Sequence, residues 1–441
     1  METFTTSLLQ VANDQSLLEA TQSKEGFAKL IKKVQETKGY KNPIGFAISR
    51  NDIVKVKNES GSYQSKVAQC NMPVVNFNKE NGENLGSAAV LHLALALNGY
   101  ELNTDKSEAV YELNLDIIST ALQIFGYYLP EAEEDDSSHQ NIQILLDIED
   151  IMENPGDLMP QEIHGTKRDQ YSVVFIYEDA PLESVEATYL KFNALSHEKA
   201  ELRSLNLNGA FGATTNVAWC EVNNTIVPVS LDWLNDNKRI LQMTGNYPIV
   251  RGNDKFPQYL DHVVPKQNTR VLDTSKVRFG AQLAAGTTVM PGASYINFNA
   301  GTTGPVMVEG RISSSAIVGN GSDIGGGASI LGVLSGTDGN PISVGQNCLL
   351  GANSVCGIPL GDACIIDAGL AILEGTKVKI SPKELEKINA ANDANNQLSG
   401  KLFKAKDLSG LNGSHYRQNS MTGEITVSRS TREVKLNAEL H

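Results

Sequence analysis

A six-residue period between Val277 and Val378 constrains the fold more than any other feature of this 441-residue chain. An aliphatic residue opens each hexad, as at Leu283, and a small residue such as Thr287 recurs four positions later. Neither the 3.6-residue period of a helix nor the alternation of a half-buried strand produces this spacing. One aliphatic residue per hexad fits short parallel strands stacked into a coil with three faces, with glycines at the corners. The segment therefore predicts a triangular parallel β-helix.

The repeat is interrupted twice. The hexads are irregular between Tyr295 and Ser315, and an insert with the sequence SGTDGNPI occupies residues 335–342. Interruptions of a repeat are where side chains become available for function, although they can also be plain corner loops. We therefore expect catalytic groups in these two interruptions of the repeat.

The remaining sequence divides by its patterns into α/β regions before the repeat and a short extension after it. An acidic stretch at Glu131–Gln140 indicates a loop, and Asn223-Asn224 joins two β-like runs as a hairpin. Apolar periodicity predicts the other elements, which are helices at 88–97, 113–129, 142–152, 182–195, 230–241 and 383–394, and a strand at 171–177. We expect four parts: α/β regions at 1–140 and 141–270, the β-helix at 271–380, and a C-terminal helix and tail at 381–441.

The composition restricts the partners. With 51 acidic and 37 basic residues the net charge is -14, which argues against binding of nucleic acid or anionic membranes because both need a broad basic field. No apolar stretch reaches membrane-helix length and no signal peptide pattern is visible. Five cysteines without a CxxC motif predict buried thiols rather than disulfides or zinc ligands. We expect a soluble cytoplasmic protein acting on small molecules, with a local basic region between Lys377 and Arg417 that suits a small anion.

Hexapeptide repeats of this kind resemble the left-handed β-helices that commonly transfer acyl groups from coenzyme A. Many of those enzymes use a histidine as base, but none of the seven histidines lies in the repeat. We interpret the histidines as surface or capping residues, with His415 alone able to approach the last coil. The same absence argues against a carbonic anhydrase, which needs three histidine ligands.

A base inside the repeat must therefore be a carboxylate, and Glu309 is the strongest candidate among Glu309, Asp323, Asp338, Asp362, Asp367 and Glu374. Glu309 lies in the irregular stretch with Arg311 two residues on. It can accept a proton from an amine or form an acyl-anhydride. The alternative is a surface Glu–Arg ion pair. Asp338 and Asp362 suit turns, and a backbone N–H in Gly325–Gly327 or at Gly332 can stabilise an oxyanion.

Several strings give the C-terminal third a specific resemblance. They are NFNAGT (297–302), MVEGRIS (307–313), GSDIGGGASILG (321–332), LSG (334–336), CLLGAN (348–353), KAKDLSG (404–410), YRQNS (416–420) and LNAELH (436–441). The sequence resembles the tetrahydrodipicolinate N-succinyltransferase family of lysine and diaminopimelate biosynthesis, and looks most like its actinobacterial-type subgroup. The resemblance implies a left-handed β-helix, succinyl-CoA as co-substrate, and a homotrimer with active sites between subunits. Residues 1–270 match only by the order of their domains.

The resemblance also implies residue roles. Glu309 is the catalytic carboxylate and Gly332 the oxyanion donor. The positions that match the succinyl-CoA groove are Arg311, Gly326, Ser329, Ala352, Asp367, Ala368 and Gly375, and those that match C-terminal coenzyme A contacts are Lys404, Tyr416, Arg417, Gln418 and Asn419. Related enzymes hold magnesium on the trimer axis through an Asp and a Glu. Ser275 and the segment 290–294 stand near those positions without a carboxylate, so the magnesium site is not carried over to this chain, and the sequence leaves open whether a metal lies on the trimer axis.

Two other functions stay open. One is a related acyltransferase that moves an acetyl group to another amine, such as that of a nucleotide sugar. The other is a non-enzymatic scaffold in which the β-helix only trimerises the N-terminal regions. The lack of a histidine base and the presence of Arg311, whose guanidinium binds carboxylates in a fork, favour succinyl transfer.

Overall fold

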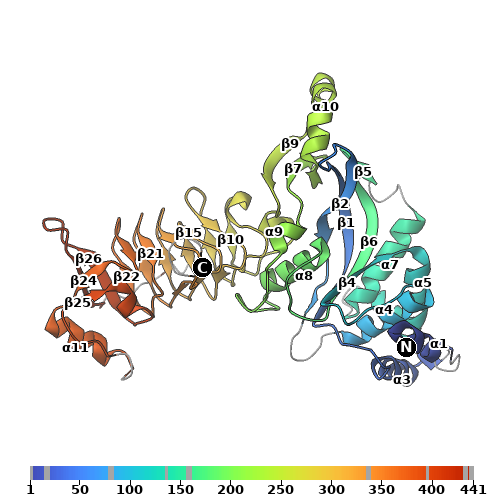
Figure 1. The fold of residues 1–441 in the computed structure, drawn as a ribbon, viewed down its shortest axis with the longest axis horizontal. Coiled ribbons are helices and arrows are strands. Elements are labelled where there is room, and N and C mark those ends of the chain that lie inside the picture. Colours follow the sequence, from blue (N-terminus) through green and yellow to red (C-terminus); the bar gives the residue numbers. More distant parts are fainter. Residues whose placement is uncertain are drawn as a thin grey trace. The chain divides into compact units, whose positions relative to one another are not determined.

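The computed structural model describes residues 3–13, 20–77, 84–134, 138–154, 161–333, 339–393, 397–430 and 436. The chain forms two compact units (Figure 1). Unit 1 comprises Met1–Ala194 and Leu205–Phe256, and unit 2 comprises Leu195–Ser204 and Pro257–His441. The four-part division by sequence pattern remains a prediction, since compactness alone yields two units. In the described part of the chain no helix is long and apolar enough to cross a membrane.

Unit 1 is built on an antiparallel sheet in the order β2-β1-β6-β4, with β3 on β1 and β5 on β6. Its strands are β1 (Gly45–Lys57), β2 (Tyr63–Asn71), β3 (Asn76–Phe77), β4 (Glu108–Leu113), β5 (Glu162–Ile163) and β6 (Thr166–Ile176). The predicted strand at 171–177 is the buried end of β6. That strand is longer than predicted because its polar N-terminal half pairs with β1 as well.

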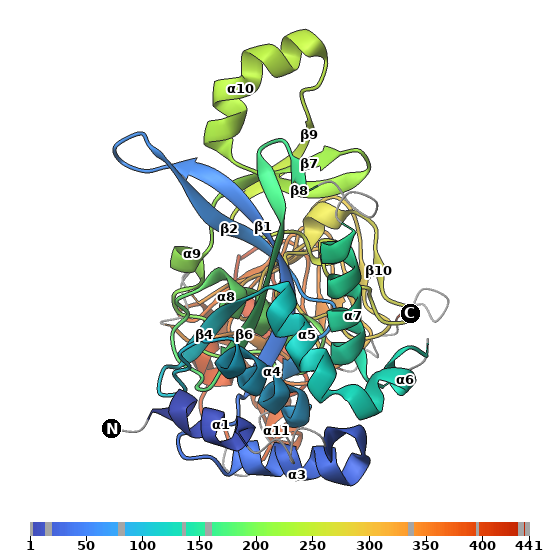
Figure 2. The same ribbon diagram turned by 90° about the vertical axis from the view of Figure 1, so that its right-hand side faces the viewer.

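Helices cover one face of this sheet. They are α1 (Phe4–Ala12), α3 (Lys24–Gln35), α4 (Leu85–Leu97), α5 (Leu115–Ile124), α6 (Leu129–Ala132) and α7 (Gln140–Glu153), with short 3₁₀ turns η1 (Ala20–Gln22) and η2 (Gly126–Tyr128). The predicted helix at 113–129 breaks after Ile124, because η2 intervenes and Pro130 starts α6. Figures 1 and 2 show α4, α5 and α7 against the sheet.

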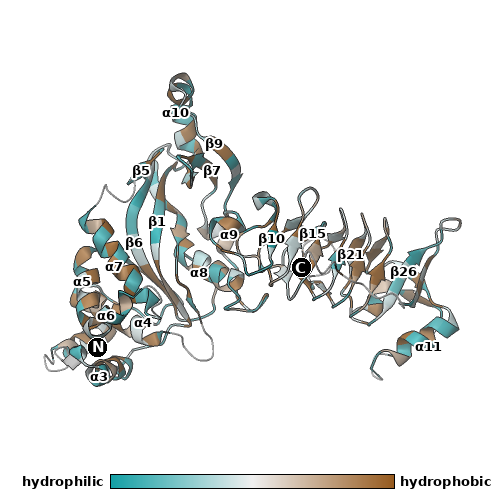
Figure 3. Ribbon diagram, turned by 180° about the vertical axis from the view of Figure 1, so that it is seen from behind, coloured by the Kyte–Doolittle hydropathy of each residue, from teal (hydrophilic) through white to brown (hydrophobic). Residues whose placement is uncertain are grey.

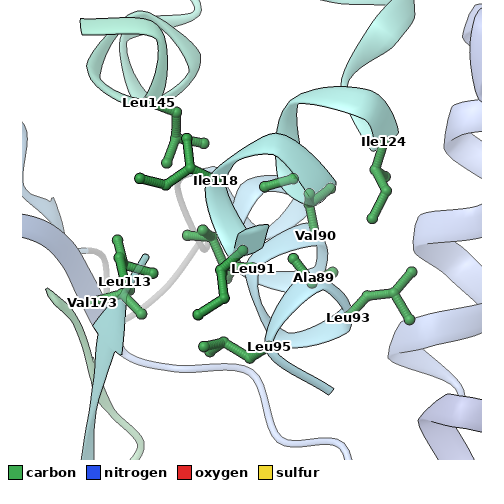
Figure 4. Packing of buried hydrophobic residues seen from close by; sticks show 14 of the residues in the cluster. Ala89, Val90, Leu91, Leu93, Leu95, Leu113, Ile118, Ile124, Leu145 and Val173 are labelled. Carbon is green, nitrogen blue, oxygen red and sulfur yellow. The ribbon is translucent and has the colours of Figure 1, made fainter. Parts of the chain in front are cut away.

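Helix α4 is the centre of this core. It is apolar on all sides, and every residue from Ala88 to Ala96 is buried, as expected for a helix surrounded by other elements. Figure 4 shows its side chains between Ile118 of α5, Leu145 of α7 and Val173 of β6. The interpretation of the histidines as surface or capping residues is wrong for His92, which is fully buried in α4. Its ring nitrogens lie 2.7 Å from Ala88 O and 2.7 Å from Tyr177 Oη.

The opposite face of the sheet carries α8 (Val185–Ser196), where Tyr189 Oη donates to Ala68 O. Beyond it lie α9 (Ala210–Ala213), β7 (Val217–Val222), β8 (Thr225–Val229), α10 (Leu231–Thr244) and β9 (Ile249–Asp254). The predicted hairpin is confirmed: Asn223 and Asn224 have φ of 51° and 62°, as a type I′ turn requires. Helix α10 begins at the N-cap Ser230 and ends at Gly245.

Unit 2 contains the predicted parallel β-helix. Face 1 is formed by β10 (Arg270–Val271), β11 (Thr288–Val289), β14 (Met307–Val308), β17 (Asp323–Ile324), β20 (Leu349–Leu350) and β22 (Ile365–Ile366). Face 2 is formed by β12 (Tyr295–Ile296), β15 (Arg311–Ile312), β18 (Ser329–Ile330), β21 (Val355–Gly357) and β23 (Ala371–Leu373). Face 3 is formed by β13 (Gly301–Thr302), β16 (Ile317–Val318) and β19 (Ser343–Val344). Short 3₁₀ turns η3 (Tyr259–Asp261) and η4 (Thr274–Lys276) precede the coils.

The registers explain the six-residue period. Val308, Ile324 and Leu350 are aligned in successive coils of face 1, and all are fully buried. The aliphatic residue of each hexad therefore fills the interior, and stacking of like side chains holds the coils together. The first half of the predicted insert, including Asp338, lies outside the described residues.

The C-terminal extension closes the last coil. Strand β26 (Ser414–Gln418) pairs in parallel with β22 and forms a hairpin with β27 (Ile425–Arg429). Strand β24 (Lys377–Lys379) pairs with β27 and antiparallel with β25 (Leu402–Lys404), which η6 (Ala405–Leu408) follows. Helix α11 (Pro382–Ala390) begins at the N-cap Ser381 and ends before the predicted limit. Figure 3 shows β26 as hydrophilic.

The segment 195–204 joins unit 2 through Arg203. The Arg203 N–H donates to Asn299 Oδ1 (2.8 Å), and the guanidinium donates to Ser315 O (2.5 Å), Ile342 O (2.5 Å) and Ser343 Oγ (2.9 Å). Arg203 therefore bonds to three successive coils on one side of the β-helix, one through its backbone N–H and two through its guanidinium.

Candidate active site

Glu309 turns an unusually short corner of the β-helix. Only Glu309 and Gly310 separate β14 on face 1 from β15 on face 2, whereas four residues separate β17 from β18 in the next coil. The tight path requires glycine at 310, because a Cβ there would lie 2.4 Å from Ala328 O. The Glu309 backbone is fixed by its N–H, which donates to Ile324 O, and by its C=O, which accepts from Gly327 N. This corner is the irregularity that the sequence placed between Tyr295 and Ser315.

The Glu309 carboxylate faces a gap left by a glycine. A Cβ on Gly326 would lie 3.7 Å from Glu309 Oε2, with no other atom within 4 Å. The half-buried side chain has no hydrogen-bond or ion-pair partner among the residues that the structure describes. Arg311 is exposed on face 2, and within that described part it forms no ion pair with Glu309. The alternative of a surface Glu–Arg pair is therefore not what the structure contains.

Small residues continue the Glu309 corner along the coil axis. The pairing of β14, β17, β20 and β22 stacks the corners that contain Glu309, Gly326, Ala352 and Ala368. Neighbouring parallel strands are about 4.8 Å apart, so the column extends roughly 14 Å from Glu309 to Ala368. Ser329 is paired with Arg311 on face 2, and Gly375 follows at the next corner. The structure thus brings most of the predicted groove residues to one corner and the adjoining face.

Charged groups gather where this column ends. Asp367 Oδ1 lies 2.7 Å from His415 Nε2, and Asp367 Oδ2 lies 3.4 Å from Arg417 Nε. The expectation that His415 approaches the last coil is confirmed. Gln418 and Asn419 are exposed at the hairpin, and Lys404 is exposed on β25. Tyr416 differs, since its side chain is fully buried in register with Ile366. Only the backbone of Tyr416 can therefore reach a ligand.

Gly332 supplies an unused backbone donor. It is buried just after β18, and its N–H has no acceptor among the described residues, whereas the preceding Leu331 N donates to Cys356 O. A buried N–H without an acceptor is rare in folded proteins, so this group is available to a ligand. Gly332 lies at the corner between faces 2 and 3, however, and Glu309 at the corner between faces 1 and 2.

Asp362, the cysteines and Ser275 have surroundings that indicate a role in the fold and not in catalysis. Asp362 Oδ1 accepts from Gln346 N (2.7 Å), which fits the expected turn role. The five cysteines are free and buried, as predicted. Ser275 is exposed in η4, and Asp273, two residues earlier, accepts from its N–H and Oγ. Within the described ranges, no group of three His, Cys, Asp or Glu side chains is arranged to hold a metal ion.

A parallel β-helix with an unpaired carboxylate at a glycine-lined corner and a free backbone N–H suits transfer of an acyl group to an amine. These features define an acyltransferase built on hexapeptide repeats. The family model described as "Tetrahydrodipicolinate N-succinyltransferase N-terminal" matches residues 25–212, and the model "Hexapeptide repeat of succinyl-transferase" matches residues 341–374.

Similar proteins extend over almost the whole chain. A 2,3,4,5-tetrahydropyridine-2,6-dicarboxylate N-succinyltransferase of Sulfurovum sp. is 54% identical over 427 residues, which is 96% of this chain and 100% of the relative. The Campylobacter jejuni protein of the same name is 48% identical over 420 residues, covering 95% and 99%. A Campylobacter jejuni crystal structure, described as a 2,3,4,5-tetrahydropyridine-2-carboxylate N-succinyltransferase, superposes with a TM-score of 0.81 at 48% identity, covering 94% of this chain and 99% of that one. The chain belongs to the tetrahydrodipicolinate N-succinyltransferase family.

Proposed function

We propose that this enzyme transfers the succinyl group of succinyl-CoA to the amine of ring-opened tetrahydrodipicolinate, in lysine and diaminopimelate biosynthesis. The substrates are tetrahydrodipicolinate, water and succinyl-CoA, and the products are N-succinyl-2-amino-6-oxopimelate and coenzyme A. The amine nitrogen bonds to the thioester carbonyl carbon, the C–S bond breaks, and the amine proton leaves to a base while the thiolate gains a proton. The observation that carries the proposal is the unpaired Glu309 carboxylate facing the gap over Gly326.

Glu309 can act in two ways. As a base it takes the proton from the attacking amine, and as a nucleophile it forms a succinyl anhydride that the amine then opens. Both routes place negative charge on the thioester oxygen, which the free N–H of Gly332 stabilises. The exposed guanidinium of Arg311 suits a carboxylate of either substrate. Mass analysis of enzyme mixed with succinyl-CoA alone separates the routes, since only the anhydride adds a succinyl group to the peptide that contains Glu309.

We infer a homotrimer with its active sites between subunits. The separation of Glu309 and Gly332 onto different corners supports this, because closed rotational symmetry brings one corner of each copy to a different corner of the next. In mixed trimers of Glu309→Gln and Gly332→Pro chains, some sites combine an intact Glu309 with an intact Gly332. Partial recovery of activity on co-expression is the expected result, and complete inactivity of well-folded mixed trimers would count against shared sites.

Succinyl-CoA is proposed to lie along the stacked corners that contain Glu309, Gly326, Ala352 and Ala368, and against the exposed charged side chains beyond the last of them. The side chains or backbones in contact would be those of Arg311, Gly326, Ser329, Ala352, Asp367, Ala368, Gly375, Lys404, Arg417, Gln418 and Asn419, with Tyr416 contributing only its backbone. We also propose a cytoplasmic location, since five unpaired buried thiols suit a reducing compartment.

The test is release of coenzyme A thiol from succinyl-CoA in the presence of tetrahydrodipicolinate, beside acetyl-CoA and a reaction without acceptor. Glu309→Gln is expected to lower kcat by about 10²–10⁴, the usual contribution of a positioned general base. Glu386→Gln on the exposed side of α11 is the matched control and should keep wild-type turnover. Faster release with acetyl-CoA would indicate the related acetyltransferase, and near-wild-type turnover of Glu309→Gln would remove Glu309 from the mechanism.

A further inference from the structure

A cavity lies within the helical layer of unit 1. Its volume is about 220 Å³, and it is lined by Phe27 of α3, by Phe125 and Tyr128, and by residues at the beginnings of α4 and α7. All of the lining residues belong to unit 1, and none of them is assigned to succinyl transfer. The volume is below the roughly 300 Å³ of the smallest drug-sized pockets and well above the ~30 Å³ that one water molecule fills. The cavity therefore suits a small metabolite.

One wall of the cavity is aromatic. The rings of Phe27 and Phe125 are stacked with their centroids 5.9 Å apart, and Tyr128 meets Phe27 edge-on with the centroids 5.0 Å apart. Phe125 is buried, and Phe27 and Tyr128 pack against the same core, so the fold holds this wall in place. Rings that are fixed by packing and face an open cavity favour the apolar body of a ligand.

The polar side of the cavity decides the charge of that ligand. Helices α4 and α7 both begin here, and neither has a side-chain cap, whereas α3 and α5 of the same layer are capped by Ser23 and Asn114. The backbone N–H groups of Gly86 and Asn141, in the first turns of α4 and α7, donate to no acceptor in the part of the chain that is described. None of the described lining residues is acidic. Free N–H groups at the positive ends of two helices favour a carboxylate.

Gly86 keeps part of the cavity open. A Cβ at this position would meet no atom within 4 Å, and the backbone of Gly86 is not in the left-handed region. Glycine is also a weaker helix former than alanine, so neither the backbone nor the packing of α4 explains its presence. What glycine provides here is free space beside the backbone N–H groups, which allows a ligand to approach them closely.

We propose that this cavity binds a small carboxylate with an apolar body, of the kind found in α-amino acids and 2-oxo acids. The carboxylate accepts from the N–H groups of Gly86 and Asn141, and the apolar body lies against Phe27, Phe125 and Tyr128. The inference goes beyond the proposed function and does not depend on it, because no residue of the proposed reaction lines the cavity. Helix α4 is the centre of the core, so a ligand bound at its first turn stabilises unit 1.

The experiment measures the Kd of L-leucine and of its 2-oxo analogue by calorimetric titration of the full-length enzyme. Leucinamide, which lacks the carboxylate, and inorganic phosphate, which lacks the apolar body, are the control ligands. Saturable binding of L-leucine, of the 2-oxo acid or of both is expected, with neither control ligand binding at the same concentration. The tighter of the two carboxylates identifies which source of the carboxylate the cavity prefers.

Two glycine variants test the location. Gly86→Leu fills the cavity, so the Kd of the carboxylate should rise at least about tenfold, while the melting temperature of the free protein stays the same or rises. Gly212→Leu on α9 is the matched control, because a Cβ at Gly212 also meets no atom within 4 Å and Gly212 does not line the cavity. Gly212→Leu should keep the wild-type Kd.

Failure of wild type to bind either carboxylate would overturn the inference, and so would an unchanged Kd in folded Gly86→Leu. Binding of phosphate or leucinamide as tight as that of the carboxylates would show a general anion site or a general apolar site, and would contradict the proposed ligand class. Displacement of the carboxylate by tetrahydrodipicolinate would place the binding in the active site instead. Glu309→Gln should bind the carboxylate as wild type does, so failure of the proposed function leaves this inference standing.

Discussion

Two neighbouring glycines should separate catalysis from folding. Alanine at Gly326 would place its Cβ in ordinary contact with Glu309 Oε2 and touch nothing else. The Gly326 backbone is not in the left-handed region, so the free energy of unfolding should stay within about 1 kcal/mol of wild type, or rise slightly through the unfolded state. Alanine at Gly325, in contrast, would place its Cβ 2.7 Å from Leu350 O. Backbone must move there, at a cost of about 1–3 kcal/mol or more.

The effect on catalysis should be large for the Gly326 variant, although its effect on stability is small. A methyl group over the Glu309 carboxylate displaces the reacting atoms by about 1 Å, and misplacement of that size costs roughly 10²-fold in rate. Gly326→Ala, and more strongly Gly326→Val, should therefore lose kcat/KM while keeping the melting temperature. Gly325→Ala should melt earlier than wild type, which Gly326→Ala should not. The assays are differential scanning fluorimetry and thiol release.

A double-mutant cycle with Glu309→Gln shows whether the two sites act together. Gly326→Val should add no further loss once Glu309 is gone, because both changes disable the same step. Wild-type kcat/KM in Gly326→Val would refute the reasoning, since a branched side chain would then occupy the gap without obstructing the reaction.

Three further predictions concern stability and binding. Burial lowers the pKa of His92 to about 4, so the unfolded chain binds more protons than the folded chain between about pH 6.5 and 4. The free energy of unfolding, measured with urea, should therefore fall by about 3 kcal/mol as pH drops through that window, and His92→Gln should lack this dependence on pH. Arg203→Met removes three guanidinium hydrogen bonds to two coils and should lower the free energy of unfolding by about 3 kcal/mol, and an unchanged melting temperature would contradict it. Tyr416→Phe should keep the KM for succinyl-CoA, because the ring points into the coil; a rise of several-fold would show that the hydroxyl reaches the donor.

Local sequence pattern was sufficient for the β-helix and for the place of Glu309 in its irregular stretch, while the catalytic role of Glu309 stays a proposal. Each coil repeats its inward aliphatic residue, so the period is visible without knowledge of the fold. The short corner also appears in the sequence, because Val308 and Ile312 are four residues apart instead of six. The separation of Glu309 and Gly332 onto different corners could not be predicted, since it depends on how many residues each corner uses.

Features that depend on distant partners were not predictable. His92 is buried because Tyr177 accepts or donates at its Nε2, 85 positions away in sequence. The basic region was visible as composition, but the pairing of β24 with β25 that sets Lys377 against Lys404 joins segments on either side of α11. Where a residue's role is set by one long-range contact, periodicity and propensity contain no trace of it.

The path of the chain between the two units affects how the protein can be made. Residues 195–204 belong to unit 2, although unit 1 is completed only by residues 205–256. During synthesis Arg203 emerges 140 residues before Ser343, the last of its partners to be made. All of unit 1 is therefore synthesised before the β-helix, and the segment 195–204 can bond to its partners in unit 2 only after the coils have formed. For the same reason no single cut yields both units whole, so isolated units are best produced as circular permutants or by co-expression of fragments rather than by truncation.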